Sequence, residues 1–186
     1  MCKRLFGLLL SILSIISMVC GSVGQCSAAA VELPAVSAKA YIVMEATTRE
    51  VFFSQNADEH LPMASTTKIM TTLLCLESGD LDTPFPVDNN AIQVEGSSMG
   101  LVKDDIVTKR ALCYGMLLPS GNDAAGATAV KLAGSLSAFA DLMNERAAQL
   151  GMQNTHFVTP SGLHDEQHYS TCLLYTSPSP RDSTSS

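Results

Sequence analysis

A serine and a lysine three residues apart, Ser65 and Lys68, form the pattern in this 186-residue sequence that has a specific chemistry. A serine hydroxyl is a weak nucleophile until a base takes its proton, and a lysine is such a base only when its neutral form is favoured. Residues three apart share a helix face. A helix N-terminus and burial both disfavour a charged lysine, and the same dipole favours an oxyanion beside the Ser65 backbone N–H. The pattern predicts Ser65 as an acyl-transfer nucleophile and Lys68 as its general base.

A second pattern, Ser120-Gly121-Asn122, lies further along, in the turn between two predicted helices. Such a turn can aim a hydroxyl and an amide at a neighbouring helix terminus. We therefore expect Ser120 to relay a proton to the leaving amine, and Asn122 to hold Lys68 and the substrate backbone. The structural alternative is that Ser120 is a helix N-cap.

Two histidines four apart, His164 and His168, raise the alternative of a zinc site on one helix face. The zinc-protease pattern places Glu directly after the first His, whereas Asp165 stands there. The preceding Pro160-Ser161-Gly162 favours a loop. We therefore expect no metal at these histidines.

Several predicted elements must position these side chains. Short β-branched and aromatic runs at residues 40–44 and 50–53 predict a hairpin. A helix over residues 65–77 carries few charges, so we expect it to be buried. Apolar spacing predicts three later helices, over residues 108–118, 123–133 and 137–150. Residues 80–100 are predicted as a loop, with a short strand near residues 92–94.

Four blocks of sequence resemble, in order and spacing, the low-molecular-weight penicillin-binding D-alanyl-D-alanine carboxypeptidases, peptidase family S11. The blocks are residues 61–71, 96–101, 117–125 and 154–165, and the resemblance runs from about Ala38 to Thr171. It implies an α/β (α+β) architecture, the penicilloyl-serine transferase or β-lactamase-like fold. In that fold, helices flank an antiparallel sheet, and the active site lies between the sheet edge and an all-helical region.

The resemblance also implies a reaction. Ser65 would attack the carbonyl between the two terminal D-alanines of a peptidoglycan stem peptide, forming an acyl-enzyme that water then hydrolyses. Lys68 would be the general base, Ser120 the proton relay and Asn122 the orienting and substrate-binding residue. Penicillins would acylate Ser65 as slow substrates, and the biological context would be the cell wall and cell shape. No metal or organic cofactor is implied.

The family's third motif, Lys-Thr-Gly or a close variant, is absent from this sequence. The strand that carries it would recognise the substrate carboxylate and supply an oxyanion donor. We therefore expect residues 31–171 to be a partial, truncated catalytic domain, and residues 31–186 alone to be inactive or unfolded.

Three alternatives remain open: a class A-type β-lactamase, a D,D-endopeptidase, and an inactive peptidoglycan-binding relative. A β-lactamase would need a positioned glutamate after Ser120, where the sequence has Glu145 and Glu166. An inactive relative would have no need for four intact site residues. An endopeptidase shares every residue discussed.

The two ends of the chain differ from the middle. Residues 1–30 combine Lys3 and Arg4, an apolar run and a small-residue cluster, which is typical of a secretory signal peptide; an uncleaved membrane helix is the weaker interpretation. We expect export to the outer face of the cytoplasmic membrane, with any peripheral membrane association depending on a further C-terminal segment. Residues 172–186 resemble a translated sequencing adapter, with a genuine Ser/Pro-rich tail as the alternative.

Composition restricts the partners. The formal net charge is −7, from 11 Lys and Arg against 18 Asp and Glu, which argues against nucleic acid. Cys75 and Cys113 lie within apolar helical patterns, which favours two buried thiols over a disulfide.

Overall fold

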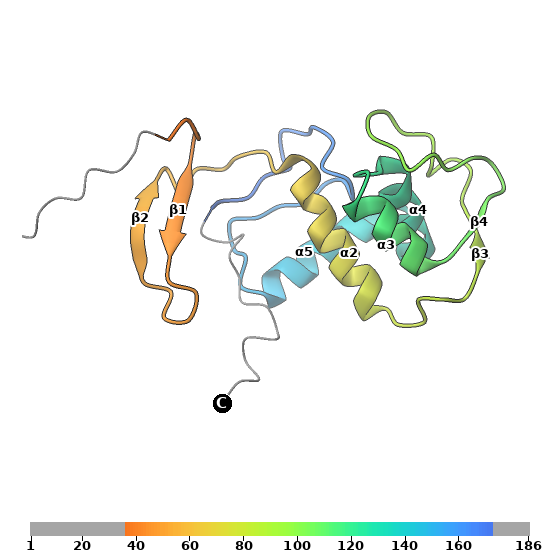
Figure 1. The fold of residues 1–186 in the computed structure, drawn as a ribbon, viewed down its shortest axis with the longest axis horizontal. Coiled ribbons are helices and arrows are strands. Elements are labelled where there is room, and N and C mark those ends of the chain that lie inside the picture. Colours follow the sequence, from red (N-terminus) through yellow and green to blue (C-terminus); the bar gives the residue numbers. More distant parts are fainter. Residues whose placement is uncertain (1–35, 173–186) are drawn as a thin grey trace, which may run out of the picture. The chain divides into compact units, whose positions relative to one another are not determined.

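The computed structural model describes residues 36–172 (Figure 1). The predicted signal peptide and all of the predicted tail except Cys172 lie outside the described residues. The chain divides between Ser37 and Ala38 into two units, and every element below belongs to the second.

The predicted hairpin is confirmed. Strand β1 (Tyr41–Met44) pairs antiparallel with β2 (Val51–Gln55), with a register shift between Val43 and Met44. The turn is closed by the Glu45 backbone N–H, which donates to the Glu50 carbonyl at 2.9 Å.

A second small sheet was not predicted. Strand β3 (Phe85–Pro86) pairs antiparallel with β4 (Ile106–Val107). Strands of two residues are too short to show an alternating pattern in the sequence. The predicted strand near residues 92–94 is wrong, because Ile92 ends a turn and residues 93–94 have no regular structure. Ile92 is apolar because it packs against the core, and not because it faces a neighbouring strand.

The predicted helices are confirmed, with one difference: the helix predicted over residues 65–77 begins as a 3₁₀ turn. A 3₁₀ turn, η1 (Ala64–Thr67), precedes α2 (Lys68–Glu77). The later helices are α3 (Lys109–Leu117), α4 (Asn122–Ala133) and α5 (Leu136–Gln149). Thr108 and Ser135 cap α3 and α5 by accepting hydrogen bonds from backbone N–H groups of their first turns.

Helix α4 lies at the centre of the helical region. It contacts α2, α3 and α5, and Figure 1 shows α2, α3 and α4 side by side. Ala124 and Ala125 are fully buried in one apolar cluster with Leu112, and Ala129 is fully buried in a second with Phe139. Small side chains on α4 let the neighbouring helices approach closely, so α4 is packed on several sides.

The sequence predicted a buried helix for this segment, and α2 is buried on one side only. Ile69 is 55% exposed and Leu76 is 49% exposed, whereas Met70 and Cys75 are buried. Low charge in the sequence did not distinguish the covered face from the open one. Cys75 and Cys113 are both buried and free, as predicted; contact with Cys113 and burial raise the pKa of the Cys75 thiol.

Within residues 36–172, none of the helices has both the length and the apolar composition needed to cross a membrane.

Candidate active site

Ser65 and Lys68 lie one above the other at the start of the α2 segment. Because η1 is a 3₁₀ turn, side chains three residues apart are nearly eclipsed. Lys68 Nζ lies 3.1 Å from Ser65 Oγ. Ser65 is exposed while Lys68 is only 1% exposed, so the serine hydroxyl is accessible from solvent and the lysine amine is shielded from water.

The surroundings of Lys68 favour its neutral form. Burial lowers the pKa of its amine below the usual lysine value. Neither of the two ion pairs found among residues 36–172 involves Lys68. Its other partners are neutral oxygens, Ser120 Oγ at 3.3 Å and the Ser161 carbonyl at 3.0 Å. A neutral amine can donate to these two and accept the Ser65 hydroxyl proton on its lone pair.

Ser120 lies in the turn between α3 and α4, as predicted, and its hydroxyl faces Lys68. Its backbone is left-handed, with φ of 60°, a strained conformation for a residue other than glycine. The N-cap of α4 is Gly121 rather than Ser120, so the N-cap alternative is wrong.

Asn122 is the first residue of α4, and its contacts differ from the expectation. Its Nδ2 donates to the Glu95 carbonyl at 2.7 Å, and its backbone N–H donates to the Ser97 carbonyl at 2.7 Å. Among the described residues, its hydrogen bonds go to this loop and not to Lys68. Asn122 thus joins residues 95–97 to the Ser120 turn.

Asp123, which directly follows Asn122, is a buried acidic residue to which the sequence patterns assigned no role. Its carboxylate is 1% exposed and accepts hydrogen bonds from the Ser98 hydroxyl and from the backbone of Met99, Gly100 and Leu101. Burial alone would raise its pKa, but these hydrogen bonds lower it below the usual value. An acidic residue in the first turn of an alanine-rich helix was the available signal.

The loop of residues 158–163 contains the Ser161 carbonyl, which accepts a hydrogen bond from Lys68. Thr71 Oγ1 donates to the Pro160 carbonyl at 2.6 Å, which fastens this loop to α2. Gly162 has φ of 83°, and a Cβ there would lie 1.9 Å from the Ala64 carbonyl oxygen. Glycine is therefore required where the loop passes the backbone next to Ser65.

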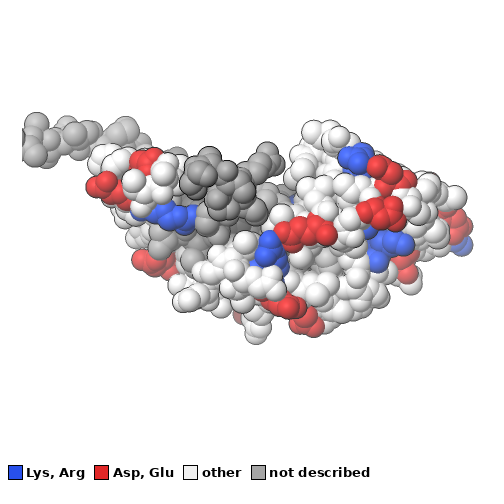
Figure 2. Space-filling view, turned by 90° about the horizontal axis from the view of Figure 1, so that it is seen from below, with Lys and Arg blue, Asp and Glu red and all other residues white. Residues whose placement is uncertain are grey.

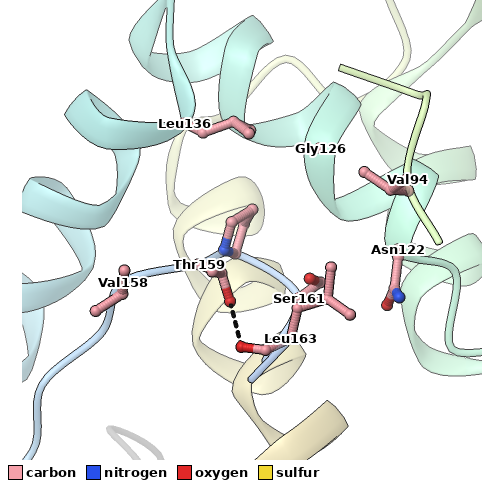
Figure 3. A pocket seen from close by; sticks show the side chains of 9 residues that line it. Val94, Asn122, Gly126, Leu136, Val158, Thr159, Ser161 and Leu163 are labelled. Atoms are coloured by element: carbon pink, nitrogen blue, oxygen red, sulfur yellow. Dashed lines mark hydrogen bonds between the residues drawn. The ribbon is translucent and has the colours of Figure 1, made fainter. Parts of the chain in front are cut away.

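A hollow of about 120 Å³ adjoins these groups (Figure 3). Its apolar lining comes from Val94, Leu136, Val158, Pro160 and Leu163. Asn122 and Ser161, both labelled in Figure 3, also line the hollow, and the Ser161 carbonyl accepts a hydrogen bond from Lys68.

The two histidines are used differently. His164 is exposed, whereas His168 is 3% exposed and both of its ring nitrogens are engaged by this chain. Within residues 36–172, no three His, Cys, Asp or Glu side chains gather in a way that could hold a metal.

Comparison with known proteins gives a consistent result. The sequence profile of the D-alanyl-D-alanine carboxypeptidase family, peptidase S11, matches residues 27–175. The chain is 36% identical over 139 residues to D-alanyl-D-alanine carboxypeptidase DacF of Bacillus subtilis, covering 72% of this chain and 36% of that protein.

Solved structures agree. The D-alanyl-D-alanine carboxypeptidase of Mycobacterium tuberculosis H37Rv matches with a TM-score of 0.73 and 32% identity, covering 80% of this chain and 58% of that one. The carboxypeptidase DacD of Francisella tularensis matches with a TM-score of 0.71 and 37% identity, covering 76% and 36%. The chain thus spans between about a third and somewhat over half of these relatives.

Proposed function

Because the chain belongs to the D-alanyl-D-alanine carboxypeptidase family, peptidase S11, we propose that the complete protein removes the terminal D-alanine from peptidoglycan stem peptides. Its fold is that of the penicilloyl-serine transferases, as the sequence resemblance implied. The observation that carries the proposal is the buried Lys68 amine, which lies 3.1 Å from Ser65 Oγ and 3.3 Å from Ser120 Oγ. This arrangement joins a nucleophile, a base and a path for the proton.

Acylation uses all three groups. Lys68 Nζ takes the Ser65 hydroxyl proton as Oγ attacks the carbonyl carbon between the two D-alanines. Collapse of the tetrahedral intermediate breaks the C–N bond. The proton held by Lys68 passes through the Ser120 hydroxyl to the leaving nitrogen, and D-alanine departs. We assign the orientation of the peptide backbone of the acyl group to Asn122, which lines the hollow.

Deacylation adds water to the Ser65 ester. Lys68, neutral again after the first half-reaction, takes a proton from the water and returns one to Ser65. Glu145 and Glu166, the two glutamates after Ser120, are exposed, and neither is hydrogen bonded to Ser65 or Lys68. This supports a carboxypeptidase with a slowly hydrolysed penicilloyl ester over a class A-type β-lactamase.

Acylation of the complete protein tests the proposal. We expect a fluorescent penicillin to label Ser65, and a synthetic acyl-D-Ala-D-Ala peptide to release D-alanine. Ser65→Ala should abolish both, while Ser98→Ala, which removes a hydroxyl that contacts Asp123 and not Lys68, should label. Release of D-alanine by the Ser65→Ala protein would overturn the proposal.

We also propose that the protein acts outside the cytoplasm, at the outer face of the cytoplasmic membrane. The N-terminal sequence pattern and the nature of the substrate support this. A mature protein that begins at Val31 and is digested by protease added to cells with an opened outer envelope is the expected result. Release from washed membranes by high salt or alkali would distinguish peripheral association from an uncleaved N-terminal helix.

A further inference from the structure

His168 joins two segments that hold the catalytic groups. Its Nε2 lies 2.8 Å from Thr67 Oγ1, and Thr67 stands between Ser65 and Lys68 in the η1 turn. Its Nδ1 accepts from the backbone N–H groups of Val158 at 3.0 Å and Thr159 at 3.3 Å. Thr67 is fully buried and His168 is 3% exposed, so water does not compete for these bonds.

The donors fix the protonation state of the ring. Because two backbone N–H groups point at Nδ1, that nitrogen carries no proton, and the neutral ring carries its proton on Nε2 and donates it to Thr67. Burial lowers the pKa of His168, Asp165 opposes this shift and His156 adds to it. Lys68, which is also titratable, follows Thr67 directly in the chain.

The two joined segments meet again at Lys68. The η1 turn carries Ser65 and leads into Lys68, and the segment after Thr159 carries the Ser161 carbonyl that accepts from Lys68 at 3.0 Å. A movement of either segment changes where the Lys68 lone pair points relative to Ser65 Oγ. Reaction rates are sensitive to such displacements: about 1 Å can cost on the order of a hundredfold.

We propose that neutral His168 is a positioning residue for acylation, which sets the distance between the Ser65–Lys68 turn and the Ser161 carbonyl through its bonds to Thr67 and to the backbone of residues 158–159. It touches neither substrate nor reacting atoms. This inference rests on the proposed function, because it assigns a role in the same reaction.

The main test measures penicillin acylation of Ser65 in the complete protein carrying Thr67→Val. Valine keeps the shape and burial of threonine, and the ring keeps its bonds to Val158 and Thr159, so one hydrogen bond is removed. Thr67→Ser keeps the hydroxyl and is the matched control. The expected result is a rate constant lowered about ten- to a hundredfold in Thr67→Val and close to wild type in Thr67→Ser.

The rate constant and the final amount of labelled protein separate positioning from folding. A purely structural role would lower the labelled fraction and leave the rate constant of the remaining sites unchanged. Loss of a positioning contact lowers the acylation rate constant of every site, and with the peptide substrate it changes kcat more than it changes KM. His168→Phe, which keeps a ring beside Phe157, should slow acylation, and the double variant should be no slower than His168→Phe.

Two results would overturn the inference. One is wild-type acylation with an unchanged rate constant in Thr67→Val, an outcome that leaves the proposed function intact. The other is spectroscopic: ¹⁵N NMR of histidine-labelled protein at neutral pH should show His168 as the Nε2–H tautomer. An Nδ1–H tautomer or an imidazolium there contradicts the inference whatever the activity. Failure of wild type to be acylated at all would instead contradict the proposed function.

Discussion

At the scale of single residues, the chemistry depends on how one amine is surrounded. Lys68 is buried among neutral oxygens, so no carboxylate holds its proton in place. Desolvation therefore acts unopposed and lowers the pKa of the amine. The same contacts aim it at both Ser65 and Ser120, which suits a group that must take a proton from one atom and deliver it to another.

Lys68→Arg should slow acylation of Ser65 by at least about a hundredfold, because a guanidinium stays protonated and cannot act as a base. In the wild type, the acylation rate constant should rise with pH as Lys68 loses its proton and level off below the usual lysine value of 10.5. Stopped-flow measurement of the acylation rate constant at a series of pH values, for the wild type and for Lys68→Arg, checks both expectations. Lys103→Arg on the exposed surface is the control, and a wild-type rate in Lys68→Arg would contradict the assignment.

At the scale of elements, the site is a junction between helix starts and loops. The η1 turn stacks Ser65 over Lys68, the α3–α4 turn presents Ser120, and the 158–163 loop brings the Ser161 carbonyl. Each piece is held by contacts made outside it, so loop substitutions should affect both stability and chemistry.

Gly162→Ala should destabilise the protein and slow acylation, because a Cβ would collide with the Ala64 carbonyl next to Ser65. Gly134→Ala is the matched control: Gly134 also has a positive φ, of 80°, but a Cβ there would meet nothing within 4 Å. We expect Gly162→Ala to lower the free energy of unfolding by about 1–3 kcal/mol more than Gly134→Ala. Urea denaturation of both variants checks this, and equal losses would show that the loop tolerates the methyl group.

Asp123→Asn should release the loop of residues 98–101 from α4, because an amide nitrogen would face backbone N–H groups. We expect a loss of about 1–3 kcal/mol in the free energy of unfolding at pH 7. The pKa of Asp123 is lowered in the folded state. Its contribution is therefore present above the usual carboxyl range and lost as pH falls through the lowered value.

The difference between wild type and Asp123→Asn should accordingly shrink below about pH 4. Thermal unfolding at a series of pH values measures it. Asp82→Asn, which removes an exposed ion pair with Arg110, should change stability little at any pH. A difference that stays constant down to pH 2 would mean that Asp123 is not the titrating group.

At the scale of the whole molecule, the helical region buries its apolar side chains, whereas the β1–β2 hairpin leaves several of its apolar side chains exposed to solvent. Val43, Val51 and Phe52 on β1 and β2 are each between 44% and 53% exposed. A two-stranded sheet of this kind is marginal by itself. On the face in Figure 2, basic side chains lie singly among acidic and uncharged ones, in keeping with the acidic composition.

Residues 31–186 expressed alone are expected to be unfolded or inactive toward penicillin, while the complete reading frame is active. The reasons are the exposed hairpin and the absence of Lys-Thr-Gly from this sequence. Penicillin labelling and amide-proton dispersion in NMR spectra of the two proteins make the comparison. Labelling of residues 31–186 at a rate near that of the complete protein would contradict this expectation.

Much of the site could be predicted from sequence because its parts are local. The Ser65–Lys68 spacing, the Ser120 turn and the helix boundaries follow from neighbouring residues, propensities and caps. The short β3–β4 pair and the open face of α2 were not predictable in this way, because neither leaves a periodic signal.

The sequence by itself predicted Ser65 as the nucleophile, Lys68 as its base and Ser120 as the relay, and it predicted the helices that carry them. Only the tertiary structure showed that the Ser161 carbonyl contacts Lys68 and that His168 contacts Thr67. The first two residues are 93 positions apart in the chain, and the second two are 101 positions apart. A backbone carbonyl has no residue-type signature, and a histidine in a polar loop is equally compatible with exposure, metal binding or burial. Such contacts exist only after chain folding has brought distant segments together, which is why the geometry around Lys68 had to come from the structure.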